Sequence, residues 1–110
     1  MNFIAATLEL RSFVSDPITA YGLDYREKLA VVPAGNSAGE VRFRLLCYDR
    51  AGAKLTAFLD WKVGTRALIT GNIVFSDDTS KPLDLIISTI ESNIPSDMYL
   101  SLIHISEPTR

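Results

Sequence analysis

Apolar and polar residues alternate along most of the chain, which is typical of strands that bury one face. The alternation predicts five strands, over residues 2–13, 27–32, 41–48, 65–75 and 83–92. Asp16 and Pro17 end the pairing of the first strand, because proline cannot donate to a ladder. Residues 21–25 read as a loop, and the segment 33–39 consists of turn-forming residues. Gly71 lies inside the fourth strand and predicts a bend or bulge there.

One segment has the period of a helix instead. Between Ala51 and Trp61, the apolar residues Leu55, Phe58 and Leu59 recur at the i, i+3, i+4 spacing of an amphipathic face. Gly64 is suited to a left-handed position after the helix end.

The order of elements is therefore three strands, one helix and two strands. This is the chain order of the OB-fold, a five-stranded, partly open Greek-key barrel with its helix between strands 3 and 4. We expect an all-β domain of this kind over residues 1–95. A two-layer α+β sandwich fits the same periodicities, because periodicity alone does not show closure.

Composition indicates one small globular domain. The chain has 110 residues, of which 47% are apolar and 22% charged. A single cysteine, Cys47, excludes an internal disulfide framework and a thiolate-rich zinc site, and favours a reducing compartment. The first residues lack the pattern of a secretory signal, and no apolar run is long enough to span a membrane. We expect a cytoplasmic protein.

Charge is segregated along the chain, although its net value is only −2. Residues 42–66 hold six Lys and Arg against two Asp, whereas residues 67–99 hold one Lys against five Asp and Glu. The basic stretch favours an anionic partner, but the solvated side of a helix and its flanking strands has the same composition.

Catalysis has little support in the residues. The only histidine, His104, lies near the C-terminus, so a hydrolase triad has no base within the domain. Asp77 and Asp78 read as a solvated hairpin tip and not as a metal pair. Cys47 shares strand parity with apolar residues and reads as a buried thiol. We predict no enzyme, no cofactor and no metal, with a small enzyme using Cys47 as a remote alternative.

The strand 41–48 has two different faces. One carries Phe43, Leu45 and Cys47, and the other carries two arginines, a leucine and a tyrosine. A face that offers cations to phosphates and aromatic rings to bases is what a single-strand-binding platform requires. An ordinary polar outer face, with the tyrosine covered by a loop, has the same pattern. The residues of this second face are Arg42, Arg44, Leu46 and Tyr48.

Residues 41–49, the helix and the segment 63–73 together resemble the centre of bacterial single-stranded DNA-binding proteins. The opening residues 1–4, the Asp16-Pro17 pair and the closing strand 83–90 are similar as well. The resemblance implies binding of single-stranded DNA without sequence preference in replication, recombination and repair, as a homo-oligomer (dimer or tetramer). It also implies a flexible C-terminal tail with an acidic-aromatic tip that recruits replication and repair proteins; we expect this tail to be missing from the given sequence and not absent from the natural protein.

On this resemblance Tyr48 corresponds to a base-stacking aromatic, Arg44 to the strand arginine and Phe75 to a stacking residue of the following connection. The predicted nucleic-acid-binding residues are Arg26, Lys28, Arg42, Arg44, Tyr48 and Phe75. Three features depart from the family pattern: Leu8 replaces a glycine, Arg42 replaces a frequent tryptophan, and the connection 76–82 is short. An OB-type protein-interaction subunit, such as a primosome or assembly factor, is the alternative function.

The C-terminal segment, residues 96–110, lies beyond the last predicted strand. Its final residues, Leu100–Arg110, agree at all eleven positions with the in-frame translation of an adaptor used in transposase-based sequencing libraries. We interpret residues 100–110 as a non-native addition that the fold does not need. The alternative is a genuine terminal strand.

Overall fold

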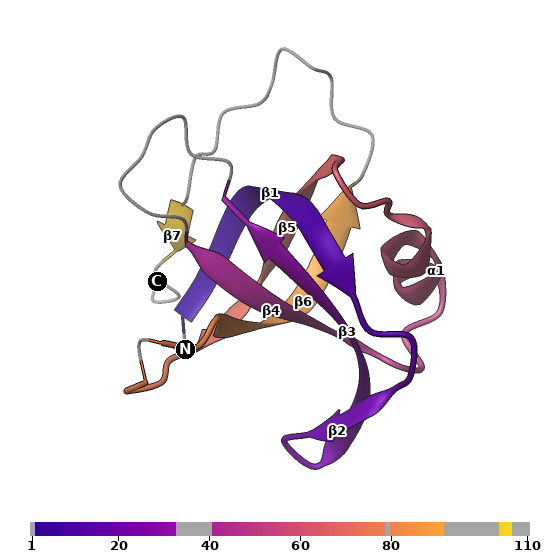
Figure 1. Cartoon of the computed structure of the whole chain (residues 1–110), viewed down its shortest axis with the longest axis horizontal. Helices are drawn as coiled ribbons and strands as arrows, with labels where there is room; N and C mark the ends of the chain where they lie inside the picture. Colours follow the sequence, from indigo (N-terminus) through magenta and orange to yellow (C-terminus); the bar gives the residue numbers. More distant parts are fainter. Residues whose placement is uncertain (1, 33–40, 79, 92–103, 107–110) are drawn as a thin grey trace.

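The computed structural model describes residues 2–32, 41–78, 80–91 and 104–106, and it shows a mostly β chain with one helix (Figure 1). The predicted turn over residues 33–39 lies outside the described residues. The elements are β1 (Asn2–Phe13), β2 (Ile18–Ala20), β3 (Leu23–Val31), β4 (Arg42–Tyr48), α1 (Ala53–Asp60), β5 (Arg66–Val74), β6 (Leu83–Glu91) and β7 (His104–Ser106).

Five of the strands form a closed ring of hydrogen-bonded neighbours, in the order β1-β3-β4-β6-β5 and back to β1. All of these pairs are antiparallel except β4–β6, which is parallel. The ring closes because β1 pairs with β5 through residues 2–9 and with β3 through residues 9–13. A register shift between Leu10 and Ser12 marks the irregularity in the β1–β3 pairing.

A second irregularity lies at Gly71, where the register of β5 against β6 shifts. A Cβ atom at this position would stand 2.2 Å from the carbonyl oxygen of Ile86, so only glycine allows the two backbones to approach this closely. The bend or bulge predicted at Gly71 is confirmed.

The core fills the inside of the ring. Phe43, Leu45 and Cys47 of β4 are buried there, which confirms the predicted inner face of this strand. Leu46 has the opposite parity but is buried as well; its neighbours across the sheet are Glu27 and Ile86. The prediction that Leu46 belongs to an exposed face is therefore wrong.

Helix α1 is shorter than predicted; Gly52 precedes it with a positive φ of 66° and offers no side-chain cap. Phe58 is buried against the core, but Leu59 is exposed and does not share this face. The backbone becomes extended at Trp61, so Gly64 does not cap the helix. It occupies a turn in which Thr65 N–H donates to the carbonyl of Lys62, and its φ of 88° is the left-handed value expected of it.

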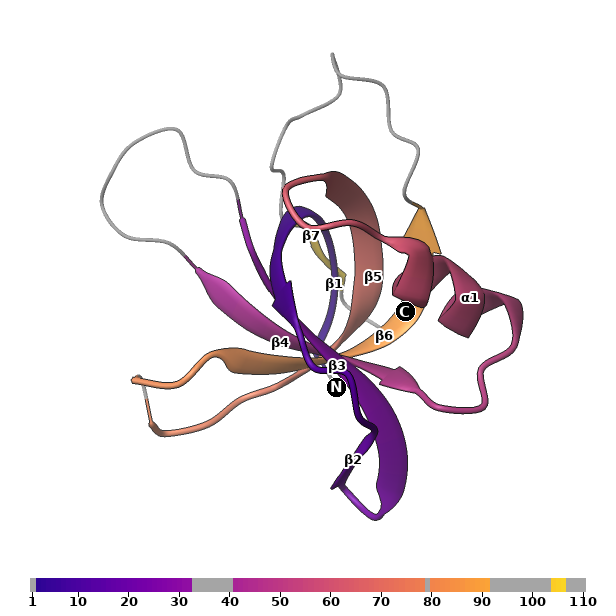
Figure 2. The same cartoon turned by 45° about the vertical axis from the view of Figure 1, so that its right-hand side comes forward.

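Two short strands were not predicted. β2 pairs with β3 and forms a hairpin from part of the segment that reads as a loop (Figure 2). β7 pairs with residues 3–5 of β1 and lies outside the closed ring. The ring is complete without β7, so the dispensability of residues 100–110 stays a prediction. Over the described residues, no helix has the length and apolar character to cross a membrane.

Candidate nucleic-acid interface

The outer surface of the ring carries a cleft of about 490 Å³, which we call the outer cleft. It lies between the tip of the β2–β3 hairpin and the connection from β5 to β6, and strands β4 and β6 supply two of its side chains. Side chains alternate between the two faces of a strand, and the neighbours Leu45 and Leu85 are buried inside the ring. Arg44 and Asp84 therefore point to the outer surface. The lining residues are Tyr21, Arg44, Val74, Phe75, Ser76, Lys81, Pro82 and Asp84.

Arg44 and Asp84 form a bidentate ion pair inside the outer cleft. The guanidinium Nε donates to Oδ1 at 2.7 Å and Nη2 donates to Oδ2 at 2.7 Å. The parallel pairing of β4 and β6 sets the two residues directly opposite each other. The hydrogen bond from Arg44 to Asp84 raises the pKa of the guanidinium above its ordinary value. Arg44 is therefore fully charged but already holds an anionic partner.

Burial opposes the charge on Asp84, yet the pKa of its carboxyl is lowered because hydrogen bonds from Arg44 and Tyr21 outweigh that effect. The Tyr21 hydroxyl donates to Oδ2 of Asp84, and this bond is the main reason that the pKa of Tyr21 is raised. The three side chains thus join the hairpin tip to β4 and β6.

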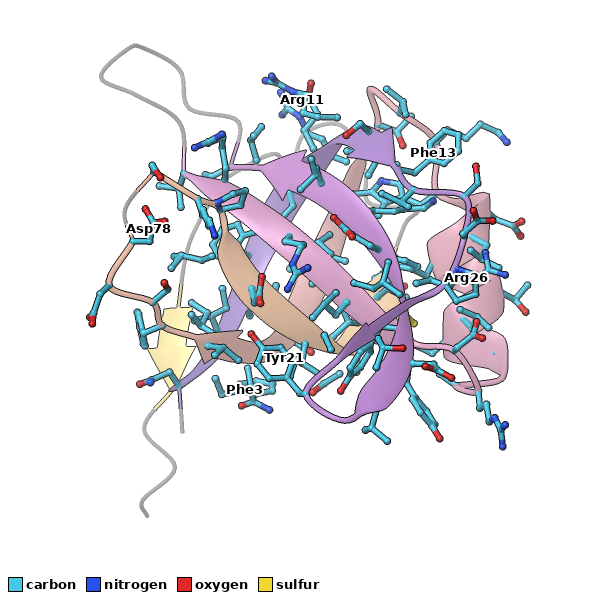
Figure 3. All side chains as sticks on the ribbon, turned by 60° about the horizontal axis from the view of Figure 1, so that its bottom comes forward. Phe3, Arg11, Phe13, Tyr21, Arg26 and Asp78 are labelled. Atoms are coloured by element: carbon cyan, nitrogen blue, oxygen red, sulfur yellow. The ribbon has the colours of Figure 1, made fainter. Side chains whose placement is uncertain are left out.

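Two exposed aromatic rings border the outer cleft. Phe75 directly follows β5 and is 63% exposed, and Tyr21 at the hairpin tip is 54% exposed. Tyr21 and Gly22 both have positive φ, 52° and 79°, which is the type I′ geometry of a two-residue hairpin turn. Figure 3 shows Tyr21 at this tip, on the side of the molecule away from Phe13 and Arg26.

Further cations lie near the β5–β6 connection. Arg42 Nη2 donates to the carbonyl of Ser80 at 3.0 Å, which ties the start of β4 to this connection. Lys81 is exposed in the outer cleft, and its Nζ is 4.0 Å from Asp78. Both side chains can reach a phosphate with little rearrangement, because neither is held in a buried bidentate pair.

Tyr48 has the outward orientation predicted for it, since it is 37% exposed and shares parity with Arg42 and Arg44. Its ring meets that of Tyr25 edge to face, with centroids 6.3 Å apart. It does not line the outer cleft. It borders a separate depression of about 150 Å³ at the other end of β4, together with Arg50.

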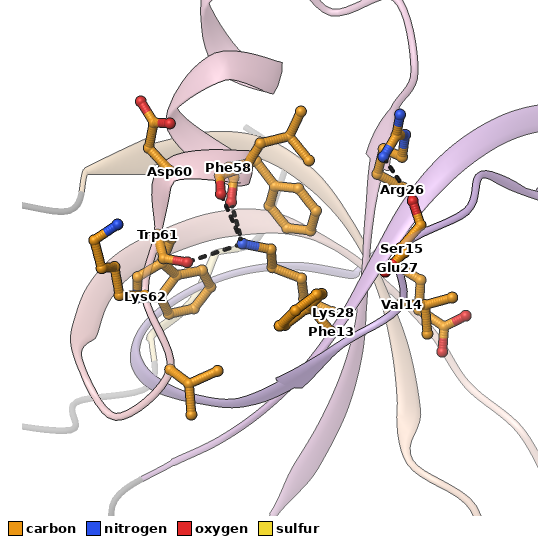
Figure 4. Close-up of a pocket in the computed structure, with 12 residues that line it drawn as sticks. Phe13, Val14, Ser15, Arg26, Glu27, Lys28, Phe58, Asp60, Trp61 and Lys62 are labelled. Carbon is orange, nitrogen blue, oxygen red and sulfur yellow. Dashed lines mark hydrogen bonds between the residues drawn. The ribbon is translucent and has the colours of Figure 1, made fainter.

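The ammonium of Lys28 is not accessible to a phosphate. This residue is 5% exposed, and its Nζ donates to the carbonyl oxygens of Phe58 at 2.6 Å and Trp61 at 2.9 Å (Figure 4). It lines a second cleft, beside α1, which we call the helix cleft. Lys28 pairs across the sheet with Leu45 and therefore points inward. The assignment of Lys28 to a nucleic-acid surface is corrected: its ammonium binds the helix end.

Arg26 is engaged near the helix cleft as well. Its Nε donates to Oδ1 of Asp49 at 2.9 Å and its Nη1 donates to the carbonyl of Ser15 at 3.0 Å. Of the six predicted residues, the structure brings Arg44 and Phe75 together in the outer cleft, sets Arg42 beside it, and places the other three elsewhere.

Cys47 and Asp78, which the sequence analysis also considered, make contacts that are typical of structural residues. Cys47 is buried, and burial raises the pKa of its thiol to about 11. Asp78 accepts hydrogen bonds from the backbone and hydroxyl of Ser80, as expected for a hairpin tip. Within the part of the chain that the structure describes, no three His, Cys, Asp or Glu side chains are grouped as metal ligands.

Among the aromatic and charged residues of the outer cleft, sequence reasoning missed Tyr21, Lys81 and Asp84. Gly22 is a turn signal, but a tyrosine is an uncommon first residue of a type I′ turn, and the pairing of β6 with β4 leaves no signal in the sequence. The candidate interface therefore depends on tertiary pairing.

Searches against protein-family models, curated proteins and solved structures found no match to this chain.

Proposed function

We propose that this chain is an OB-fold protein that binds single-stranded DNA in the outer cleft without sequence preference. The ring order, with one parallel pair and a helix between its third and fourth strands in chain order, supports the OB assignment. In OB-folds the face of strands 2 and 3 and the loops after strands 1 and 4 bind oligonucleotides. Here these parts correspond to β3–β4, the β2 hairpin and the β5–β6 connection.

The observation that carries the proposal is the grouping of Phe75 and Tyr21 with Arg44 and Lys81 around one open cleft. Exposed rings give flat surfaces on which bases stack, at roughly 1–3 kcal/mol per base and for any base. The cations lie close enough to these rings to meet the phosphates of the same strand. Exposure of a large aromatic ring to water is unfavourable when the ring has no partner. The presence of two such rings at one polar cleft therefore favours a binding role.

A protein partner is the second candidate, and one observation favours it. Arg44 is neutralised by Asp84, so this face is less positive than its sequence indicates, and Arg42 keeps its charge but has one donor on a backbone carbonyl. A protein ligand would need fewer free cations than DNA. The two functions differ in salt dependence, because only phosphate contacts release condensed counterions.

The proposal is tested by replacing Phe75 with alanine. Phe13 provides a matched control, since it is exposed to a similar extent (59% against 63%) but lines the helix cleft. Affinity is measured by the anisotropy of a fluorescein-labelled oligo-dT, because the single tryptophan, Trp61, is buried at the helix cleft and is a poor reporter for the outer cleft.

Phe75→Ala should weaken binding by roughly 1–3 kcal/mol, which is the stacking contribution of one base. Phe13→Ala should leave the affinity unchanged. Both variants remove exposed rings, so neither should lower the melting temperature substantially. Equal affinities for the two variants and the unmodified chain would exclude the outer cleft as the binding site.

A further inference from the structure

The Arg44–Asp84 pair has a consequence for any anion that enters the outer cleft. The pair is held by two hydrogen bonds of 2.7 Å, one to each carboxylate oxygen. Both side chains stand on the outer face because Arg44 and Asp84 are direct partners in the parallel register of β4 and β6. Arg44, the less exposed of the two cations that line the cleft, is thus occupied before a ligand arrives.

A guanidinium binds a carboxylate and a phosphate in the same planar, two-bond geometry. Asp84 therefore occupies the position that a phosphate of the strand would take on Arg44. Tyr21 donates a further hydrogen bond to Asp84 and holds the carboxylate from the hairpin side. A strand can gain the bidentate contact through Nε and Nη2 of Arg44 only if this carboxylate is displaced.

We propose that Asp84 is the residue that limits phosphate binding in the outer cleft, an inference that rests on the function proposed above. The strand is then held mainly by stacking on Phe75 and Tyr21, with Lys81 and Arg42 as the available cations. Removal of the carboxylate charge releases Arg44 and adds one phosphate contact.

The test is the substitution Asp84→Asn, which keeps the shape of the side chain and removes its charge. Asp77→Asn is the matched control, because Asp77 is exposed on the β5–β6 connection and does not line the outer cleft. Asp84→Asn should bind oligo-dT about tenfold more tightly at low salt, through one additional charge-assisted bidentate contact. The slope of log affinity against log salt should steepen by about 0.7, the value for one phosphate of a single strand.

Asp77→Asn changes the net charge by the same amount, so it should alter affinity by no more than about twofold if long-range attraction alone is at work. A double variant, Asp84→Asn with Arg44→Gln, separates the mechanism further. If the gain passes through Arg44, the double variant should bind no more tightly than the unmodified chain. A gain that persists in the double variant overturns the proposal.

Loss of the ion pair can destabilise the fold, so a second measurement uses the unmodified chain. The Nε–Hε resonance of Arg44 should keep its chemical shift when oligo-dT saturates the unmodified protein, because Asp84 remains its acceptor. A large shift at saturation, which would show that a phosphate has displaced the carboxylate, overturns the proposal, as does equal affinity of Asp84→Asn and Asp77→Asn. If neither the unmodified chain nor any variant binds oligo-dT, the proposed function itself fails.

Discussion

Replacing Lys28 with methionine should destabilise the fold, because this side chain satisfies the carbonyl end of α1. Its Nζ donates to the carbonyls of Phe58 at 2.6 Å and Trp61 at 2.9 Å, and makes a longer contact of 3.4 Å to that of Leu59. The last carbonyls of a helix have no partner within it. Each buried acceptor left unsatisfied costs roughly 1–3 kcal/mol, and because the Phe58 carbonyl keeps a longer bond of 3.4 Å from Trp61 N–H, the loss of the two ammonium bonds costs about 2–4 kcal/mol.

Part of this cost is offset, because the substitution also removes a charged ammonium whose burial is itself unfavourable. Loss of hydration lowers the pKa of Lys28 below its ordinary value, an effect that nearby Asp60 only partly offsets. Methionine fills the space of the aliphatic part of the lysine side chain and carries no charge that needs hydration. The substitution therefore leaves only a small cavity. We expect a net loss of about 2 kcal/mol, which corresponds to a fall in melting temperature of roughly 10 °C for a domain of this size.

Urea denaturation followed by the fluorescence of Trp61 measures this effect directly. Trp61 is buried beside the helix end, and its indole N–H donates to the carbonyl of Thr65 at 3.2 Å. Lys62→Met is the control, because Lys62 directly follows Trp61 in the chain but its side chain is exposed. If Lys28→Met proves as stable as this control and the unmodified chain, the ammonium contributes nothing net to the helix end and the reasoning is refuted.

Three further predictions concern other parts of the molecule. Tyr48 lies outside the outer cleft, so only an oligo-dT long enough to run along β4 to its ring should lose roughly 1–3 kcal/mol of binding on Tyr48→Ala, while Tyr48→Phe stays neutral; unfolding of the alanine variant would show instead that the Tyr25 contact is structural. Because the pKa of the Cys47 thiol is raised from 9.0 to about 11, the folded state keeps a proton that the unfolded chain loses, so stability should fall as pH rises from 9 to 11. Denaturation of Cys47→Ala across this range should show a fall smaller by up to about 3 kcal/mol, and an unaltered pH profile would contradict this cause. Deletion of residues 100–110 removes β7 but no strand of the closed ring, so the melting temperature should change by less than about 2 °C; a loss of several degrees would mean that this segment is part of the stable fold.

The strands and the inner face of β4 could be predicted from the sequence, because alternation with period two records which residues are buried. Phe43, Leu45 and Cys47 illustrate this, and the positions of the strand ends differ from the predictions by only a few residues. Gly71 was informative for another reason: a glycine within an apolar strand indicates a close backbone approach, and the structure has one.

The candidate site was less predictable, because it depends on which strands become neighbours. Arg44 and Asp84 are 40 positions apart and meet only through the parallel β4–β6 pairing. Lys28 is polar and therefore reads as a surface residue. It is buried because its side chain extends to the end of α1, whose carbonyls accept its hydrogen bonds, a tertiary effect that local pattern does not record.

The central claim is that the outer cleft binds single-stranded DNA through stacking and a few phosphate contacts. Its most direct test is the affinity for labelled oligo-dT, measured by anisotropy at several salt concentrations between about 50 and 200 mM. The account predicts saturable binding whose log affinity falls linearly with log salt, with a slope of about −1.4 for contacts from Arg42 and Lys81. No saturable binding at the lowest salt, or binding whose affinity does not change with salt, would contradict it.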